Sequence, residues 1–314
     1  MTDYEAVREG GAGLIDLSAA RGRIRVSGSE ATMFLNGLIT NDVKNLAQNR
    51  WMPAVFPTVQ GRLIGAVRVI RGSEPTFLID TEAASHEAVL KTISRFTLAG
   101  DFKVADVTSE TALLTVQGKR AAEVVEKVFE TPVSELPNNG VVETNVTIVR
   151  ATHTGEDGFD IIVEASRAAE IRQSLESAGA QPISDETFEI LRVEAGIARF
   201  GRDMDETNVV PETNLDDAVS YTKGCYVGQE IIVRIKHRGH PAKKLTALRF
   251  ETDQKIEPGT IIKSTDDQEI GRVTSAVVSP KLGSIGLGYV RYEYVGDGTK
   301  VLVDGIEAIV GNHG

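Results

Sequence analysis

The only cysteine of the chain, Cys225, lies in a segment rich in glycine and basic residues, "YTKGCYVGQEIIVRIKHRGH", residues 221–240. Within residues 223–244, six basic residues are opposed only by Glu230, which gives a local charge of +5. Neighbouring cations favour a thiolate, so an exposed Cys225 would be reactive. The alternative is a small buried hydrophobe, the usual fate of a free cysteine. The glycines on either side favour a tight turn that a ligand or another backbone segment approaches closely.

Two histidines in the same segment, His237 and His240, raise the question of a metal site with Cys225. Three candidate ligands without a carboxylate at a recognisable spacing are a weak signal. We therefore expect solvated loop histidines and no metal centre.

A second candidate is "HTGEDGFDIIV", residues 153–163. Most acidic turns of this kind, here Gly155 to Gly158, only lead into a strand. A carboxylate held on such a turn, that of Glu156, is also suited to accept two hydrogen bonds from a ring amidine such as that of a pterin or guanine.

The third candidate, "LRVEAGIARFGRDMDE", places Arg192 and Glu194 on a helix that ends at Gly196. A buried arginine joins a structural ion pair more often than it contacts a ligand.

Length and composition limit the classes of protein. With 314 residues we expect two or three domains, and 41% hydrophobic with 25% charged residues is typical of a soluble globular protein. The net charge of −11 disfavours direct binding to nucleic acid or to an anionic membrane. The absence of a secretory leader or long apolar run, together with a single cysteine, indicates a cytoplasmic location.

The hydrophobic pattern divides the chain near residue 240. Before it, strands such as "RGRIRVSG" alternate with helices, among them "SEATMFLNGLIT" with Ser29 as its predicted cap and a helix running from a Ser184 cap to Gly196. After it, short strands separated by turn residues, without helices between them, predict a small barrel or sandwich. We therefore predict an α+β region over 1–240 and a β-barrel domain over 241–314.

These three candidate stretches, with "GLIDLSAARGRIRVSG" and "LITNDV" upstream, resemble the YgfZ-type folate-binding family over nearly the whole chain. That family is related to the T-protein of the glycine cleavage system, an aminomethyltransferase that uses tetrahydrofolate. The resemblance implies a three-domain ring of two interleaved α+β domains, one of them ferredoxin-like, and a C-terminal β-barrel.

The resemblance also assigns residues. It implies that tetrahydrofolate or a derivative is bound in a central channel by Glu156, with Gly155 and Arg192 in the same site, and that Cys225 lies at or near the channel mouth. The residues that match the YgfZ signature are Lys223, Gly224, Cys225, Tyr226, Gly228, Gln229, Glu230 and Arg234; Cys225 and Lys223 are its candidates for chemistry.

One departure bears on activity. T-proteins carry paired aspartates in the strand that corresponds to "VQGRLIGAVRV", where this chain has Gly65 and Ala66. An acid beside the reacting folate nitrogen is what aminomethyl transfer needs for proton transfer and charge stabilisation. Its absence argues against that reaction.

The main hypothesis is therefore a folate-binding accessory protein that supports assembly or repair of iron–sulfur enzymes and so affects tRNA modification indirectly. Its partners would be a reduced folate and iron–sulfur client or assembly proteins, and nothing in the sequence demands more than a monomer. The alternative is a folate-dependent aminomethyl or one-carbon transferase. Direct RNA binding through the +5 segment is the least favoured hypothesis.

Overall fold

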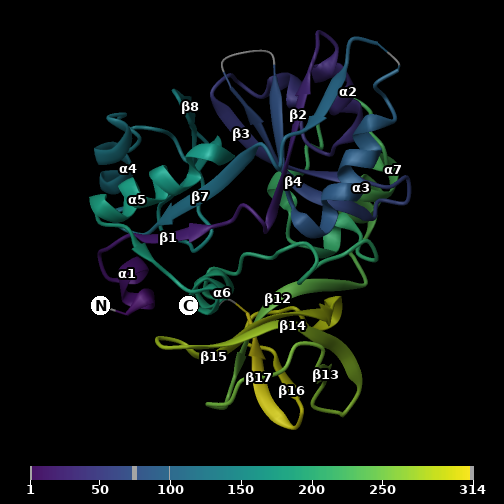
Figure 1. Ribbon diagram of the computed structural model, residues 1–314. Coiled ribbons are helices and arrows are strands. Elements are labelled where there is room, and N and C mark those ends of the chain that lie inside the picture. The colour runs from purple at the N-terminus through teal and green to yellow at the C-terminus, as the bar shows by residue number, and fades with distance from the viewer. Residues whose placement is uncertain (1, 73–75, 99, 312–314) are drawn as a thin grey trace.

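The computed structural model describes residues 2–72, 76–98 and 100–311. Figure 1 shows three lobes, two of mixed helix and sheet and a third formed by the last part of the chain. The helices are α1 (Asp3–Arg8), α2 (Ala31–Leu38), α3 (Ala83–Ser94), α4 (Ala121–Phe129), α5 (Ala168–Ala178), α6 (Asp185–Glu194) and α7 (Gln229–Arg238).

The first sheet has the strand order β11-β1-β7-β10-β9-β8. Its strands are β1 (Gly13–Asp16), β7 (Thr111–Gln117), β8 (Val141–Glu143), β9 (Thr147–Arg150), β10 (Gly158–Glu164) and β11 (Gln181–Pro182). Within it, β1 pairs parallel with β11 and antiparallel with β7.

The second sheet, in the order β3-β4-β5-β2-β6, is antiparallel and is built from the chain between β1 and β7. Its strands are β2 (Arg21–Ser27), β3 (Arg50–Pro57), β4 (Leu63–Arg71), β5 (Phe77–Glu82) and β6 (Lys103–Asp106). Because the first sheet takes strands from before and after it, the two α+β domains are interleaved, as predicted.

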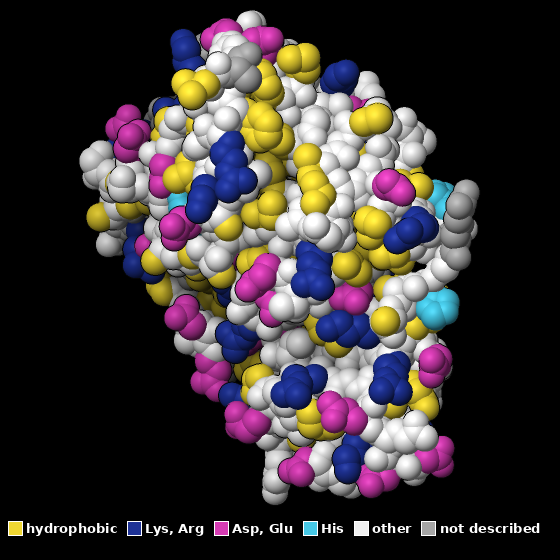
Figure 2. Space-filling model, turned by 90° about the vertical axis from the view of Figure 1, so that its right-hand side faces the viewer, with side chains coloured by type: hydrophobic (Ala, Val, Ile, Leu, Met, Phe, Trp, Pro, Cys, Tyr) yellow, Lys and Arg dark blue, Asp and Glu magenta, His cyan; other side chains and the backbone are white. Residues whose placement is uncertain are grey.

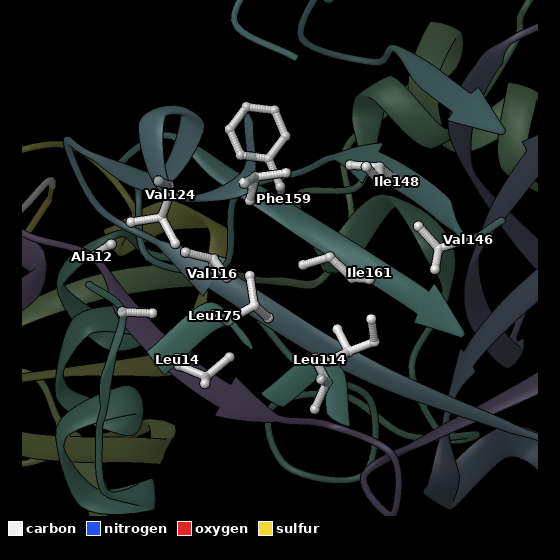
Figure 3. Packing of buried hydrophobic residues seen from close by; sticks show 14 of the residues in the cluster. Ala12, Leu14, Leu114, Val116, Val124, Val146, Ile148, Phe159, Ile161 and Leu175 are labelled. Carbon is white, nitrogen blue, oxygen red and sulfur yellow. The ribbon is translucent and has the colours of Figure 1, made fainter. Parts of the chain in front are cut away.

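The first sheet has a hydrophobic core on each face. On one face, alternate residues of β7 and β10, including Val116 and Ile161, pack with Val124 of α4 and Leu175 of α5 (Figure 3). The period of two along a strand sends their neighbours to the opposite face. There Leu113 and Ile162 belong to a cluster that also contains residues of the second sheet, so the two sheets pack together.

The third lobe is a closed barrel in the order β12-β15-β14-β13-β16-β17. Its strands are β12 (Lys243–Phe250), β13 (Ile261–Lys263), β14 (Glu269–Ser279), β15 (Gly283–Arg291), β16 (Lys300–Val303) and β17 (Ile306–Val310). Helix α6 packs against β14 and β15 and joins the barrel to the rest of the molecule. The predicted α+β fold with a C-terminal barrel is confirmed.

Two predicted helix starts have different outcomes. Ser184 caps α6, since its hydroxyl accepts a hydrogen bond from the Thr187 amide. The Ser29 prediction is wrong, because α2 begins after Glu30 and has no side-chain cap. Instead the Ser29 amide donates to Asp101 at 2.8 Å, a contact from a distant segment that local sequence does not reveal.

Candidate functional site

A cavity of about 200 Å³ lies where β3 and β4, the segment 151–153, α6 and the segment 197–200 meet. Its walls are mostly apolar. The aromatic residues in its lining are Trp51, Phe188 and Phe200, and the polar ones include Arg21, Arg68, Glu82, His153, Arg192 and Arg199. Trp51 is held in orientation because its indole N–H donates to the Arg150 carbonyl at 2.8 Å. A concave site with apolar walls and a few converging polar groups is the usual form of a small-molecule site.

Positions 65 and 66, where acids were expected, face in different directions. Ala66 lines the cavity. Gly65 faces α3 instead, where an added Cβ would lie 2.7 Å from Val89 Cγ2 and 2.9 Å from the Ser85 side chain. Only position 66 could therefore present a carboxylate to the cavity without rearranging α3.

A chain of alternating charges runs along the second sheet beside the cavity. Arg21 donates to Asp80 at 2.7 and 2.8 Å and to Glu82 Oε1 at 2.7 Å. Glu82 Oε2 accepts from Arg199 at 3.0 and 3.3 Å. Because Arg199 follows α6, this chain ties the cavity's second-sheet wall to the segment that closes the opposite side.

The same chain of charges continues into the first sheet through Arg68. Its Nη2 lies 2.5 Å from Asp80 Oδ2 and 2.6 Å from Asp160 Oδ2, and Asp160 also contacts His153 Nε2 at 3.0 Å. Burial alone would raise the pKa of Asp160, but His153 and Arg68 outweigh it and hold that pKa well below its usual range. Asp160 is therefore an ionised carboxylate that joins the two sheets.

Arg192, a predicted ligand-site residue, does line the cavity, but all its N–H groups are used within the protein. Its guanidinium donates twice to Glu189 and once each to Asp203, the Ile197 carbonyl and the Ser275 hydroxyl. A guanidinium has five N–H donors. With its side chain only 1% exposed, Arg192 connects α6 to the barrel.

The structure does not bring Glu156 into the cavity. Its carboxylate accepts from Arg8 at 3.1 Å, and Arg8 also pairs with Glu194 of α6 at 2.7 Å. Glu156 lines a separate groove between α1, α6 and the barrel turn at Pro280. Gly155 has the left-handed φ of +83° that the predicted turn requires and approaches Ala195 in the same region. The sequence predicts that Glu156 and Gly155 bind folate in a central channel, and the structure places both outside the lining of this cavity.

The side chain of Lys223 is buried and contacts the end of α2. Its ammonium donates to the carbonyls of Asn36, Ile39 and Asn41 at 2.6, 2.9 and 2.6 Å. These carbonyls lie at and beyond the end of α2, where helix carbonyls lack intrahelical partners. Burial lowers the pKa of Lys223 to about 8. Since an ammonium has three N–H donors, all are occupied.

The backbone around Gly228 fits against the β3–β4 hairpin and α2. Gly228 has φ +76° and precedes α7, and an added Cβ would lie 2.3 Å from the Thr58 carbonyl oxygen. The Val227 amide donates to the Gly37 carbonyl at 3.1 Å. Tyr226 is buried beneath Lys223, with the ammonium 5.1 Å from its ring centroid, and burial raises its pKa to about 12. Three of the eight signature residues, Lys223, Tyr226 and Gly228, thus pack the chain together.

The other signature residues lie at the surface. Cys225 is exposed and is not among the residues that line the central cavity. Gly224, Glu230 and Arg234 are exposed as well, and Gln229 is half-buried in the first turn of α7. The described residues contain no group of three or more histidine, cysteine or acidic side chains placed to hold a metal ion.

The basic segment does not form a continuous basic surface. Lys223 is buried, and Lys236 pairs with Asp216 at 2.7 Å. On the face that lies at the right of Figure 1, basic and acidic side chains are interspersed (Figure 2). Of the described basic side chains of this segment, Lys223 and Lys236 therefore do not contribute to an unpaired basic surface.

Sequence reasoning missed the alternating charges beside the cavity. Their signal was present, since Arg68, Asp80 and Asp160 are charged residues in the interior of mostly apolar strands. A charge that a strand buries needs a partner, because unpaired burial is costly. The partners could not be found from the sequence, as they lie on different strands.

This architecture, an interleaved pair of α+β domains with a cavity between them and a C-terminal barrel, defines a known class. Residues 1–223 match the model of the GCVT N-terminal domain, and residues 243–308 match the glycine cleavage T-protein C-terminal barrel domain. The chain therefore belongs to the GCVT family. Residues 224–242, which include Cys225, lie between the two matches.

Curated relatives share this family over almost the whole chain. An aminomethyltransferase of Rubrobacter xylanophilus is 32% identical over 308 residues, which cover 96% of this chain and 81% of that protein. One from Thermoanaerobacter pseudethanolicus is 29% identical over 313 residues, covering 96% and 84%. Both relatives are named aminomethyltransferase, which is the activity of the alternative hypothesis. The assignment of this chain to the YgfZ branch remains a prediction.

A solved structure shows the same fold. The glycine cleavage system aminomethyltransferase T from Bartonella henselae superposes with a TM-score of 0.91 at 24% identity, covering 98% of this chain and 87% of that chain. Among the described residues, no helix combines the length and apolar character needed to cross a bilayer.

Proposed function

We propose that the central cavity binds a reduced folate and that the chain is a folate-binding accessory protein rather than an acid-assisted aminomethyltransferase. The observation that carries the proposal is Ala66, which lines the cavity where transfer chemistry would need a carboxylate. The part of the proposal that concerns iron–sulfur enzymes rests on the sequence resemblance around Cys225.

The cavity suits a planar heterocycle. Trp51 and Phe188 offer aromatic surfaces, and Glu82 is the carboxylate in the lining. Glu82 already accepts three hydrogen bonds from Arg21 and Arg199, and a carboxylate offers about four acceptor positions. One position therefore remains for a ring N–H. A reduced folate would supply a one-carbon carrier nitrogen, while Trp51, Phe188 and Glu82 would hold and orient its ring.

Calorimetric titration with tetrahydrofolate under reducing conditions tests the binding site. We expect binding in the wild type and its loss in Ala66→Phe, which fills the cavity. Glu156→Ala should bind normally, because Glu156 lines a different groove. Binding lost in Glu156→Ala but retained in Ala66→Phe would move the folate out of the cavity.

Aminomethyl transfer is the second candidate, and the names of the curated relatives favour it over the accessory role. The discriminating assay follows methylenetetrahydrofolate formation from an aminomethyl donor. We expect no turnover in the wild type and a measurable rate in Ala66→Asp. Wild-type turnover would establish the second candidate and show that another group replaces the missing acid.

The accessory role is tested in a strain that lacks the protein. We expect wild-type protein to restore the activity of iron–sulfur enzymes and Cys225→Ala to fail. Since Cys225 is exposed, this variant should fold normally. Full restoration by Cys225→Ala would remove the thiol from the proposal.

A further inference from the structure

The cavity contains a histidine that is paired with a buried acid through one ring nitrogen. His153 lines the cavity, and its side chain is 14% exposed. Its Nε2 lies 3.0 and 3.1 Å from the two carboxylate oxygens of Asp160, which is fully buried on β10. The imidazole is therefore held in place by β10 through this nitrogen.

The other ring nitrogen, Nδ1, is available to a ligand. It has no hydrogen-bond partner among the described residues, and it is not enclosed, since the buried polar atoms without a partner include Nδ1 of His86 but not Nδ1 of His153. The ring of Phe188, which also lines the cavity, meets the imidazole in an edge-to-face arrangement with 6.1 Å between centroids. A ligand that lies against this aromatic wall therefore has a polar atom beside it.

Asp160 decides which nitrogen of His153 carries the proton. An ionised carboxylate only accepts hydrogen bonds, so the neutral imidazole keeps its proton on Nε2 and presents the lone pair of Nδ1. Arg68 contacts Asp160 from the other side, with Nη2 2.6 Å from Asp160 Oδ2, which favours the ionised form. His153 is thus a proton acceptor oriented by a buried acid, the arrangement that general bases use in proteins.

The charges around His153 favour a proton that arrives together with an anion. The chain of charges beside the cavity pairs three arginines with three carboxylates, which are Arg21, Arg68, Arg199, Asp80, Glu82 and Asp160. Arg192 of α6 also lines the cavity, but it is paired with Glu189 and Asp203. Because these charges are balanced, a proton from solvent would leave an extra positive charge, whereas a proton from a ligand leaves a neutral pair of imidazolium and anion.

We propose that His153 is a proton-transfer group of the cavity, which takes a proton at Nδ1 from a planar aromatic ligand with an acidic O–H or N–H group. In this step the O–H or N–H bond of the ligand breaks, its electron pair stays on the ligand, and a new N–H bond forms at Nδ1. Nε2 keeps its own proton and its hydrogen bond to Asp160, whose charge stabilises the imidazolium. The inference goes beyond the proposed folate site, because it assigns a reactive group to the cavity and holds for any ligand of this kind.

A coloured acid shows where the proton lies. 4-Nitrophenol is planar, and its anion is yellow whereas the neutral phenol is not, so absorbance reports the proton of the bound molecule. Titration of the full chain is made at a pH about one unit below the pKa of free 4-nitrophenol, where about a tenth of the free phenol is ionised. We expect the bound phenol to be mainly the yellow anion.

The control ligand is 4-nitroanisole, which has nearly the same shape but no acidic proton. Its binding is followed by the fluorescence of Trp51, the only tryptophan in the sequence and part of the cavity lining. We expect it to bind without the colour change.

The matched variants are His153→Gln and His86→Gln. Glutamine at 153 keeps an N–H donor for Asp160 but removes the basic nitrogen. We expect 4-nitrophenol to bind about tenfold more weakly to His153→Gln, and as the neutral phenol, with 4-nitroanisole unchanged. His86 also contacts an acid, Asp106, through Nε2 at 2.9 Å, but its Nδ1 is enclosed and it is not among the residues that line the cavity. His86→Gln should therefore bind 4-nitrophenol like the wild type.

Two results would overturn the inference: wild-type protein that binds 4-nitrophenol only as the neutral phenol or not at all, or equal binding of the yellow anion by His153→Gln. The first result comes from wild-type protein alone and does not depend on how the variant folds. A purely structural role of His153 would change stability but not the protonation of a bound phenol. Tetrahydrofolate is titrated in parallel. Proton transfer from 4-nitrophenol without tetrahydrofolate binding would reject the proposed folate site and leave the role of His153 standing, and the reverse result would do the opposite.

Discussion

The central cavity and the segment around Cys225 each concentrate residues that could do chemistry, but the structure uses them differently. At the cavity, charged side chains from both sheets form an alternating chain in which Arg68 lies between Asp80 and Asp160. In the Cys225 segment, Lys223 is saturated by backbone carbonyls, and Cys225 lies exposed outside the cavity lining. A dense sequence motif therefore does not by itself show how the structure uses its residues.

The largest effect should come from removing Arg192, the cavity arginine whose N–H groups are all hydrogen-bonded within the protein. Arg192→Met leaves Glu189 and Asp203 without their buried partner, and we expect a loss of about 3–5 kcal/mol in the free energy of unfolding. Urea denaturation measures it. Arg120→Met, which breaks only an exposed pair with Glu123, is the control and should unfold like the wild type. Equal midpoints for Arg192→Met and the wild type would mean that these acids find other partners.

A smaller loss is expected in the Cys225 segment from Gly228, one of the two glycines that flank Cys225 and that the sequence does not distinguish. Gly228→Ala forces a side chain into a left-handed conformation and against the Thr58 carbonyl, at a cost of about 1–3 kcal/mol. Gly224→Ala is the matched control, since an added Cβ there meets no atom within 4 Å. Equal urea midpoints for the two variants would contradict the structural role of Gly228.

The third expected effect is a pH dependence carried by Lys223. Its pKa is about 8 in the folded chain against an ordinary value of 10.5. Between these values the unfolded chain binds more protons, so the contribution of Lys223 to stability rises with pH in this window and is constant below it. We expect the wild type to gain stability relative to Lys223→Met between pH 8 and 10. Comparing the two proteins cancels the effect of the growing net negative charge, and parallel pH profiles would contradict the assignment.

The sequence correctly predicted the parts of the fold that depend on the local pattern of residue types. Ser184 caps α6 because its own hydroxyl reaches an amide three residues on, and the strands after residue 241 close into the barrel that their spacing indicated. The Ser29 cap prediction failed because α2 begins after Glu30 without a side-chain cap, while the Ser29 amide donates to Asp101 of a distant segment. Local pattern predicts that an element exists, but its first residue also depends on contacts from distant segments.

The site was harder to predict because its geometry depends on pairs that are far apart in the sequence. Arg192 lines the cavity, but its hydrogen bonds to Asp203 and Ser275, among others, occupy all its N–H groups. Glu156 lies on the predicted turn but faces Arg8, from the first helix of the chain. Conversely, Arg68 drew no attention in the sequence and became prominent only once the neighbours of each of its nitrogens were known.

The contact between Lys223 and the end of α2 can form only late in synthesis of the chain. The three carbonyls that it binds precede it by 182 to 187 residues, so they leave the ribosome long before their partner exists. During that interval water must solvate the end of α2, and the second sheet cannot reach its final packing there. Although domains tend to fold as they emerge, the first α+β lobe of this chain is completed only by a segment made after most of the protein.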